Sequence, residues 1–561
     1  MRWRKSDWMG GITATSIVLV LAGCSFTPKP LTYEDQKQLL HADRIKIQNE
    51  VQPLPAGTTL TLDEAVARGL KYNLEYRAKM LEQAIAVGAY DLSKYDMLPK
   101  VLANAGYSYR NNYFISTAVG AYSGKPSLGE PFANSQKEYG TAGLSLSWSL
   151  LDFGVSYFNA LQNADRIVVA SERRRHTMHI LVQDIRAAYL RAAVSEKLRK
   201  DVVRIMHDAT IALQDSGKVE SQGLRPPLEA LRYRRSLLEN MKVLEIISQE
   251  LATAMIELNQ LINLPASTKI DLQHPNDLPI PSTYHEVDLG EFEVRALASN
   301  ADLKESIYNA RIAVEETHKS LLKLLPGLTF NVGPQVTNNA YWINSRWLEG
   351  SASVSFNLWN LLTAPEAIQL ANANKDLASQ KRMMVQMAIV SQVYLAKQQL
   401  EGSWDIYQRS LEVDTVDARI AKIMTDRARA GTASAAEQVA AESASIVSQL
   451  RKYQALAQLF AASGKLQATA GLEPQIGSVN DLSLGQMIEI VREAFRVWDS
   501  GQLPALPVST PLEVAPNKLN PEQSLDLPVP TPPADAPNKL NVELDLGRPP
   551  ALSVAVAQDI N

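Results

Sequence analysis

TAGLSLSWSL, residues 141–150, alternates small or polar side chains with apolar ones at every second position. A period of two is typical of a β-strand with one apolar face and one polar face. SASVSFNL, residues 351–358, repeats this alternation, and a further candidate strand precedes each of the two. The sequence therefore predicts four strands, at about residues 101–110, 137–150, 327–336 and 350–358.

Helices of unusual length follow both pairs of strands. Between residues 155 and 216 there is neither glycine nor proline, and a continuous helix over this stretch would be ~90 Å long. The returning stretch, residues 237–261, has apolar residues in steps of three and four, which form a narrow coiled-coil seam. We expect two long helical hairpins, at about residues 154–263 and 362–470.

The chain contains an internal duplication. Residues 62–73 align without a gap on residues 289–300 at an offset of 227, and Leu, Glu, Arg, Leu and Asn recur at equivalent positions. The second strand of each half and the later turns align at an offset of 208, so 19 residues are extra in a loop expected at 111–136. An insertion confined to one exposed loop is consistent with a true repeat. The two repeats span residues 60–265 and 266–474.

The N-terminus resembles a bacterial lipoprotein signal peptide. Two arginines and a lysine in the first five residues precede an apolar stretch, residues 12–21, that is too short to span a bilayer. The stretch ends in Leu-Ala-Gly-Cys, and Cys24 is the only cysteine. A chance match is the alternative. We expect a signal peptide at 1–23, acylation of Cys24, and a lipid-anchored arm at 24–59. In such lipoproteins, a Ser25 in place of Asp implies sorting to the outer membrane.

The C-terminal part of the chain differs in composition from the repeats. Residues 475–500 include a short amphipathic pattern that predicts one more helix. Residues 501–561 are rich in proline and cannot bury enough apolar surface to order themselves, so we expect a disordered tail.

Composition and motifs argue against nucleic-acid binding and catalysis. Lys and Arg number 56 against 60 Asp and Glu, which leaves no basic field to attract phosphate backbones. We find no phosphate-binding glycine loop, nucleophile elbow or paired-His metalloprotease motif, so we expect no catalytic residue. His176 and His179 lie three apart beside arginines. No third metal ligand is apparent, so a solvated helix face is the preferred interpretation and no metal site is expected.

The number of strands has a consequence for assembly. Four strands with a lipid-facing side cannot close on themselves, and open edges are not tolerated in hydrocarbon. Known transmembrane barrels begin at about 8 strands. Such a chain must therefore share a barrel with at least one more copy, and three copies would leave a wider lumen. The number of strands leaves both assemblies open.

Roughly residues 60–474 resemble the TolC-like outer-membrane efflux proteins. The motifs that carry the resemblance are Leu-x-Glu-Ala from Leu62, the following Asn73, Leu98-Pro99 before the first strand, and LLDFG at residues 150–154. The second half has LWNLL at residues 358–362 instead, without the Asp and the Gly.

The resemblance implies a mainly α-helical fold with a small membrane β-part. Three copies would contribute four strands each to a twelve-stranded β-barrel, which a twelve-helix α-barrel continues across the periplasm. It also implies an outer-membrane location, a periplasmic adaptor and an inner-membrane pump as partners, and passive conduction without a cofactor other than the lipid on Cys24. A wide lumen selects weakly, so the exported substrate and the class of pump stay open.

Two turns of similar sequence are the candidate functional site. GLRPPLE, residues 223–229, and GTASAAE, residues 431–437, each have a Gly followed six residues later by a Glu. In the family these turns form the periplasmic mouth, which implies a gating role for Glu229 and Glu437. The alternative is an ordinary helix cap with a first-turn Glu. The turn residues that the resemblance places near an adaptor are Gly223, Leu224, Pro226, Pro227, Gly431 and Thr432.

The second turn departs from the family pattern. Where the family has a Tyr and an Arg, this chain has Ala428 and Ala433, with Arg427 and Arg429 close by. A latch at this turn would therefore use different contacts.

Two other functions are alternatives to the channel. A periplasmic adaptor lipoprotein would also carry an anchoring Cys and a helical hairpin, but only one hairpin between small β-domains. An enzyme on a helical scaffold would need a convergent polar site. The duplicated pattern favours the channel over both.

Overall fold

The structure is a computed structural model that describes residues 30–55, 57–117, 119, 121–125, 129–221, 226–273, 278, 280–281, 284, 287–472, 479, 481–501 and 503. The chain divides into two units, Met1–Leu512 and Glu513–Asn561, and every described residue belongs to the first. The expected signal peptide, Cys24 and nearly all of the proline-rich tail lie outside the described residues.

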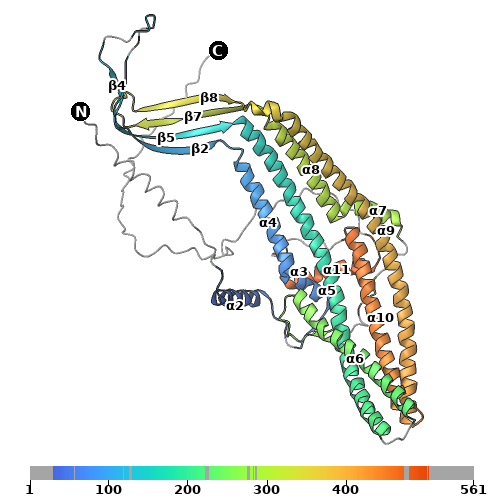
Figure 1. Ribbon diagram of the computed structural model, residues 1–561. Helices are drawn as coiled ribbons and strands as arrows, with labels where there is room; N and C mark the ends of the chain where they lie inside the picture. Colours follow the sequence, from blue (N-terminus) through green and yellow to red (C-terminus); the bar gives the residue numbers. More distant parts are fainter. Residues whose placement is uncertain are drawn as a thin grey trace. The chain divides into compact units, whose positions relative to one another are not determined.

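Four strands form one antiparallel sheet in the order β2-β5-β7-β8 (Figure 1). The strands are β2 (Lys100–Tyr109), β5 (Glu138–Ser149), β7 (Gly327–Thr337) and β8 (Arg346–Ser355). The central contact, between β5 and β7, joins the two repeats. Strands β2 and β8 form the edges of this sheet.

The position of the last strand differs from the sequence prediction. Strand β8 pairs with β7 from Arg346 to Ser355 and ends there, whereas alternation had suggested residues 350–358. The side chain of Asn357 accepts a hydrogen bond from the backbone N–H of Trp359 at 3.1 Å. Asn357 and Leu358 therefore lie in the turn that leads into the next helix, which begins at Trp359, although their polar-apolar alternation continues.

The sheet has one apolar and one polar face, because residues directly opposite each other on neighbouring strands share a face. One row across the sheet consists of Val101, Leu146, Val332 and Gly350. The next row consists of Lys100, Ser147, Asn331 and Ser351. Many apolar side chains of the sheet, such as Val332, stay exposed in the single chain.

Two long helical hairpins continue from the sheet. The first consists of α5 (Leu150–Ser221) and α6 (Pro227–Leu261), and the second of α9 (Trp359–Arg429) and α10 (Ala435–Thr469). Helix α5 follows β5 without a loop. The two hairpins pack together through contacts of α10 with α5 and α6. Their shared core includes six fully buried leucines: Leu198, Leu237, Leu244, Leu258, Leu459 and Leu466.

A pair of shorter helices precedes the strands of each repeat. Neither pair is among the elements predicted from the sequence. They are α3 (Leu62–Tyr72) and α4 (Leu74–Tyr95), and α7 (Leu289–Ser299) and α8 (Ala301–Leu322). The duplicated residues 62–73 and 289–300 correspond to α3 and α7, each with the asparagine that follows it.

The asparagine that recurs in the two repeats makes equivalent hydrogen bonds in each of them. Asn73 lies between α3 and α4, where its side chain accepts a hydrogen bond from Tyr76 N–H and donates one to the Leu261 carbonyl at the end of α6. Asn300 does the same between α7 and α8, with Leu303 N–H and the Thr469 carbonyl at the end of α10. Each asparagine therefore caps one helix and fastens it to the end of its own repeat's hairpin.

Replacing Asn300 with alanine is expected to lower the free energy of unfolding by about 2 kcal/mol. The loss combines a missing helix cap with an unpaired buried carbonyl at Thr469. Chemical denaturation of the detergent-solubilised protein measures it. Asn309→Ala, on the exposed side of α8, should change stability by less than about 0.5 kcal/mol. Equal losses in both variants would contradict the double role of Asn300.

Helix α11 (Leu484–Asp499) lies within the range expected for the amphipathic helix. It packs on α3 and buries Met487, Val491, Phe495 and Trp498. The guanidinium carbon of Arg186, on α5, lies 4.7, 4.8 and 5.9 Å from the ring centres of Phe460, Phe495 and Trp498. Cation–π attraction therefore helps to hold α11 against the hairpins.

The remaining described elements are short or peripheral. Helix α2 (Tyr33–Glu50) lies in the N-terminal arm. Strands β3 (Phe114–Ser116) and β4 (Phe132–Ser135) form a small hairpin inside the loop expected at 111–136, and β1 (Thr59–Leu60) pairs in parallel with β6 (Asp271–Leu272).

Of the helices that the structure describes, none has the length and apolar character needed to cross a membrane.

Candidate functional site at the hairpin tips

The second hairpin reverses direction at Gly431. Its φ of +71° lies in the left-handed region, which favours glycine. The N–H of Gly431 donates to the Ala428 carbonyl at 3.0 Å, and the N–H of Thr432 donates to the Arg427 carbonyl at 2.8 Å. These two bonds define a Schellman motif, which satisfies carbonyls at the end of α9. Gly431 therefore allows the chain to reverse direction at the end of α9.

Glu437 takes part in a capping box at the start of α10. Its carboxylate accepts hydrogen bonds from the backbone N–H and the hydroxyl of Ser434, both at 2.8 Å. The Ser434 hydroxyl in turn accepts from the Glu437 N–H at 3.3 Å. The bonds from the Ser434 backbone and side chain, with the charge of Arg427, lower the pKa of Glu437. In a single chain this carboxylate is thus a charged helix cap.

The first tip is only partly described. Gly223 and Leu224 lie outside the described residues. Pro226 is the N-cap of α6 and Pro227 its first residue, a position where the missing N–H of proline costs nothing. Glu229 is exposed in the first turn of α6. No side-chain cap bond forms at Pro226, so the two tips differ in how their helices begin.

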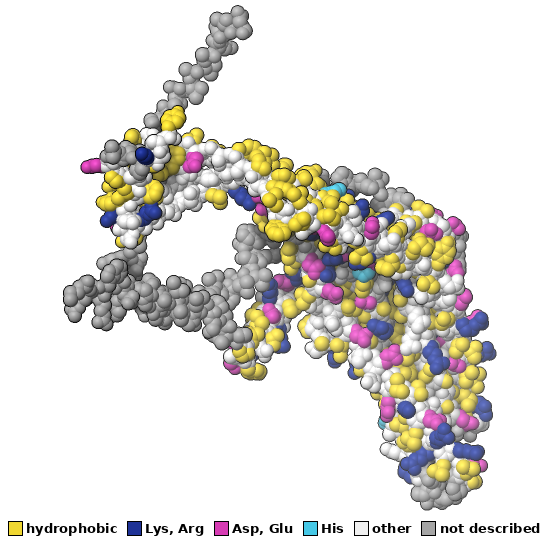
Figure 2. Space-filling model, turned by 45° about the horizontal axis from the view of Figure 1, so that its top comes forward, with side chains coloured by type: hydrophobic (Ala, Val, Ile, Leu, Met, Phe, Trp, Pro, Cys, Tyr) yellow, Lys and Arg dark blue, Asp and Glu magenta, His cyan; other side chains and the backbone are white. Residues whose placement is uncertain are grey.

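Basic side chains are frequent near the tips (Figure 2). Arg232, Arg234 and Arg235 follow the first turn, and Arg427 and Arg429 precede the second; all five are exposed. The exposed part of this end therefore combines cations with the two candidate gate carboxylates.

A polar junction above the second tip was not found from the sequence. Glu442, on α10, accepts hydrogen bonds from Arg204 of α5 at 2.8 Å, Thr425 of α9 at 2.9 Å and Gln438 at 2.9 Å. Burial acts to raise the pKa of Glu442, but the bonds from Gln438, Arg204 and Thr425 outweigh it, and the pKa is lowered. A charged Glu442 thus ties the first hairpin to both helices of the second. Its sequence context resembles any polar helix position, so no local signal marks it.

The fold matches those of solved outer-membrane channels. The outer-membrane channel OprN aligns at a TM-score of 0.56 and 16% identity, over 73% of this chain and 89% of OprN. The CmeC outer membrane channel of Campylobacter jejuni aligns at a TM-score of 0.57 and 12% identity, over 78% and 90%. A membrane protein from Pseudomonas aeruginosa aligns at 0.58 and 14%, over 75% and 92%. The chain has the outer-membrane channel fold.

The channel fold confirms the resemblance predicted from the sequence at the level of the architecture. OprN and CmeC are channels rather than enzymes, in agreement with the prediction that the chain does no catalysis. No protein-family model and no curated protein sequence matches the chain.

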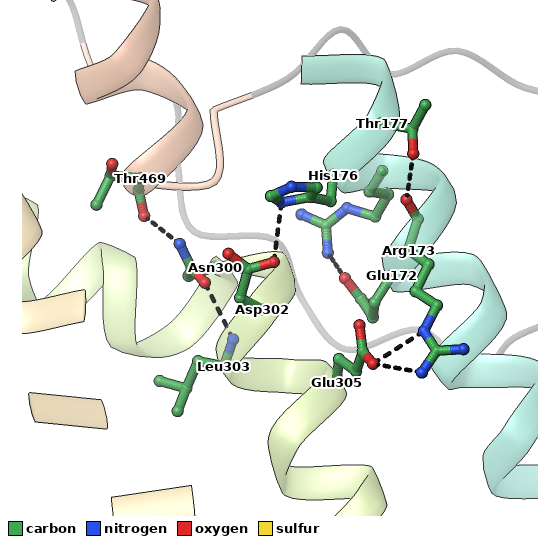
Figure 3. A network of polar contacts seen from close by, with 10 residues as sticks. Glu172, Arg173, His176, Thr177, Asn300, Asp302, Leu303, Glu305 and Thr469 are labelled. Atoms are coloured by element: carbon green, nitrogen blue, oxygen red, sulfur yellow. Dashed lines mark hydrogen bonds and ion pairs between the residues drawn. The ribbon is translucent and has the colours of Figure 1, made fainter. Parts of the chain in front are cut away.

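Within the channel fold, His176 lies in a polar network between α5 and α8 (Figure 3). Its Nδ1 is 2.8 Å from a carboxylate oxygen of Asp302, and Arg173 pairs with Glu305 at 2.8 Å. Figure 3 shows that these pairs come from facing turns of the two helices. His176 is therefore part of a helix–helix contact, not only of a solvated face. Among the described residues, no group of three or more His, Cys, Asp and Glu side chains is placed to hold a metal ion.

The His176 contact should depend on pH. The hydrogen bond with Asp302 raises the pKa of His176 above 6.5. The stabilising effect is therefore complete below pH 6.5 and is lost as the pH rises through the higher folded-state pKa. We expect His176→Gln to destabilise the protein more at pH 5.5 than at pH 8.5. Half of the side chain is exposed, so screening limits the difference to about 0.5 kcal/mol.

Denaturation of the wild type and variant at both pH values measures this difference. His41→Gln, on α2, serves as the control for a general effect of losing an exposed histidine. An equal destabilisation by His176→Gln at both pH values would contradict the contribution of the protonated ring.

Proposed function

We propose that the protein is the outer-membrane duct of an export system and conducts substrates passively. The observation that carries this proposal is the four-stranded sheet, which has one apolar face, two open edges and direct continuation into two long helical hairpins. In lipid, open strand edges must be paired, which requires further copies. The channel fold of solved neighbours supports the same role.

The proposed assembly is a trimer with a twelve-stranded β-barrel and a twelve-helix periplasmic tunnel. An inner-membrane pump would supply the substrate through a periplasmic adaptor that contacts the hairpin tips. The duct itself would perform no chemistry and use no cofactor. An acyl anchor on Cys24 would hold the N-terminal arm at the outer membrane. The trimer, the adaptor and the pump are what the resemblance to the TolC-like proteins implies, and the anchor is what the lipoprotein-like N-terminus implies.

Reconstitution tests the duct. Protein extracted in detergent is expected to elute as an oligomer on a sizing column and to produce conductance steps in planar bilayers. A folded, water-soluble monomer without conductance would overturn the proposal. In cells, deletion should increase sensitivity to an exported compound or abolish secretion of a protein.

The periplasmic adaptor is the second candidate. An adaptor has one helical hairpin between small β-domains, whereas this chain has two hairpins that continue from one shared sheet. An adaptor would also give no conductance, so the bilayer measurement separates the two candidates.

The gating role of Glu437 can be separated from its capping role. Glu437→Gln keeps an oxygen acceptor for the cap but removes the charge, whereas Ser434→Ala weakens the cap and keeps the charge. A ring of Glu437 carboxylates would favour cations. Glu437→Gln should then reduce cation preference in reversal-potential measurements, and Ser434→Ala should not. Glu229→Gln applies the same measurement to the first tip. Unchanged selectivity in both glutamine variants would contradict a gating role for either carboxylate.

A further inference from the structure

Two basic residues lie directly opposite each other at the end of the sheet that is away from the helices (Figure 1). The register of β2 with β5 ends at Tyr109 and Glu138, and one position further the N–H of Arg110 donates to the Lys137 carbonyl at 2.8 Å. A pair of this kind has its Cα atoms about 5.5 Å apart. Like charges at opposed positions of two strands are destabilising. The fold therefore carries a local cost here, which a bound anion would offset.

Neither of these two cations is neutralised within the chain. Among the residues that the structure describes, no carboxylate forms an ion pair with Arg110 or Lys137. The carboxylate of Glu138 accepts a hydrogen bond from the Tyr107 hydroxyl at 3.1 Å, and both residues have strand positions of the apolar face. Arg110 and Lys137 have positions of the polar face. Glu130, the one acid of the inserted loop, is exposed.

Two consecutive aromatic rings hold the cations in place. The guanidinium carbon of Arg110 lies 5.1 Å from the ring centre of Phe114, and Nζ of Lys137 lies 4.9 Å from that of Tyr113. Figure 2 shows basic side chains among hydrophobic ones at this end of the sheet. A cation–π contact attracts the charge to the ring face. It leaves N–H donors of the guanidinium and the ammonium available to the oxygen atoms of a ligand.

Contacts with the second repeat support the two rings and the strand that carries the lysine. The ring of Tyr113 packs beside Tyr341, with 6.3 Å between the ring centres. Gln136, which precedes the lysine, donates its backbone N–H to the Asn339 side chain at 3.2 Å and accepts the Ala340 N–H at 3.0 Å. Asn339 is 1% exposed. Side chains that are positioned before a ligand arrives lose less conformational freedom on binding.

We propose that Arg110 and Lys137 bind a phosphate group of an anionic ligand. Two neighbouring cations match the charge of a phosphate, and arginine binds two of its oxygens in a bidentate geometry. The ligand is a soluble phosphorylated compound or the phosphorylated headgroup of a membrane lipid, since both carry the same group. All residues of the site come from one chain, so the site does not depend on the proposed duct. In that duct it would lie at the outer mouth.

Calorimetric titration of the full-length protein in detergent with inorganic pyrophosphate, at low ionic strength, tests the site. Arg110→Gln combined with Lys137→Gln is expected to weaken binding at least about tenfold, because both charge-assisted contacts are lost. Each single variant should lose part of the affinity. Arg346→Gln is the matched control. Arg346 is the first residue of β8, at the same end of the sheet, but it pairs with Val336 on the apolar face. This variant should bind like the wild type.

Lipid A with and without its phosphates, in mixed detergent micelles, separates the two sources of the ligand. Binding of phosphorylated lipid A alone would assign the site to a membrane headgroup, and binding of pyrophosphate alone to a soluble compound. Either result supports the site if the double variant loses the binding and still elutes like the wild type. No binding of either probe, or an equal loss in Arg346→Gln, would overturn it. Since calorimetry needs no pore, intact binding without conductance would contradict only the duct.

Discussion

Replacing Val332 with arginine is expected to prevent the protein from accumulating in the outer membrane as an oligomer. Val332 lies on β7, between Leu146 and Gly350 on the neighbouring strands, in the middle of the apolar face. An arginine on the lipid side of a membrane strand costs about 2–4 kcal/mol at the bilayer midplane. In the proposed trimer, the cost would apply three times to the assembled state.

Asn331→Arg is the matched control, because the neighbouring residue on the same strand points to the polar face. This variant should assemble like the wild type. Quantifying the oligomer band in the outer-membrane fraction measures both variants. If Val332→Arg assembled as well as Asn331→Arg, the apolar face would not be in contact with lipid and the membrane assignment would be wrong.

Replacing Asp414 with alanine should cause the largest loss of stability in the helical part. Asp414 of α9 accepts a hydrogen bond from Lys452 of α10 at 2.5 Å, and each side chain is 11% exposed. Removing one member leaves the other charge buried without its counter-charge, which typically costs about 3–5 kcal/mol. The second hairpin would then unfold at a lower denaturant concentration than in the wild type.

The double variant Asp414→Leu with Lys452→Met shows whether the loss comes from the unpaired charge. A well-packed apolar pair often replaces a buried ion pair at little cost. We therefore expect the double variant to unfold within about 1 kcal/mol of the wild type in chemical denaturation. Equal destabilisation in the single and double variants would instead show that the loss of stability comes from altered side-chain packing and not from the unpaired charge.

Local patterns in the sequence were sufficient for the element types. The alternation in residues 141–150 predicted β5, since a period of two is a property of the strand itself. The glycine-free stretch at 155–216 predicted most of α5. The same approach extended β8 to residue 358, because alternation continues past Ser355 where the pairing with β7 ends.

The candidate site was predictable where it depends on neighbours in the chain. Gly431 has the left-handed φ at the turn, and Pro227 begins α6, and both features depend on residue types with a known local preference. The capping box of Glu437 is likewise formed by residues three apart. Glu442 was missed because its partners Arg204 and Thr425 are remote in sequence, and only the packing of two hairpins brings them to its carboxylate.

The sequence by itself determined the periodicities, the turns and the duplication with its two offsets, because each depends on residues a few positions apart or on a direct copy. The tertiary structure alone decided that β5 pairs with β7, that α5 packs against α8, and that α4 and α9 pack on the outer sides of these two helices. Pairing between remote segments follows from which faces can be buried together, and a one-dimensional pattern does not contain that choice.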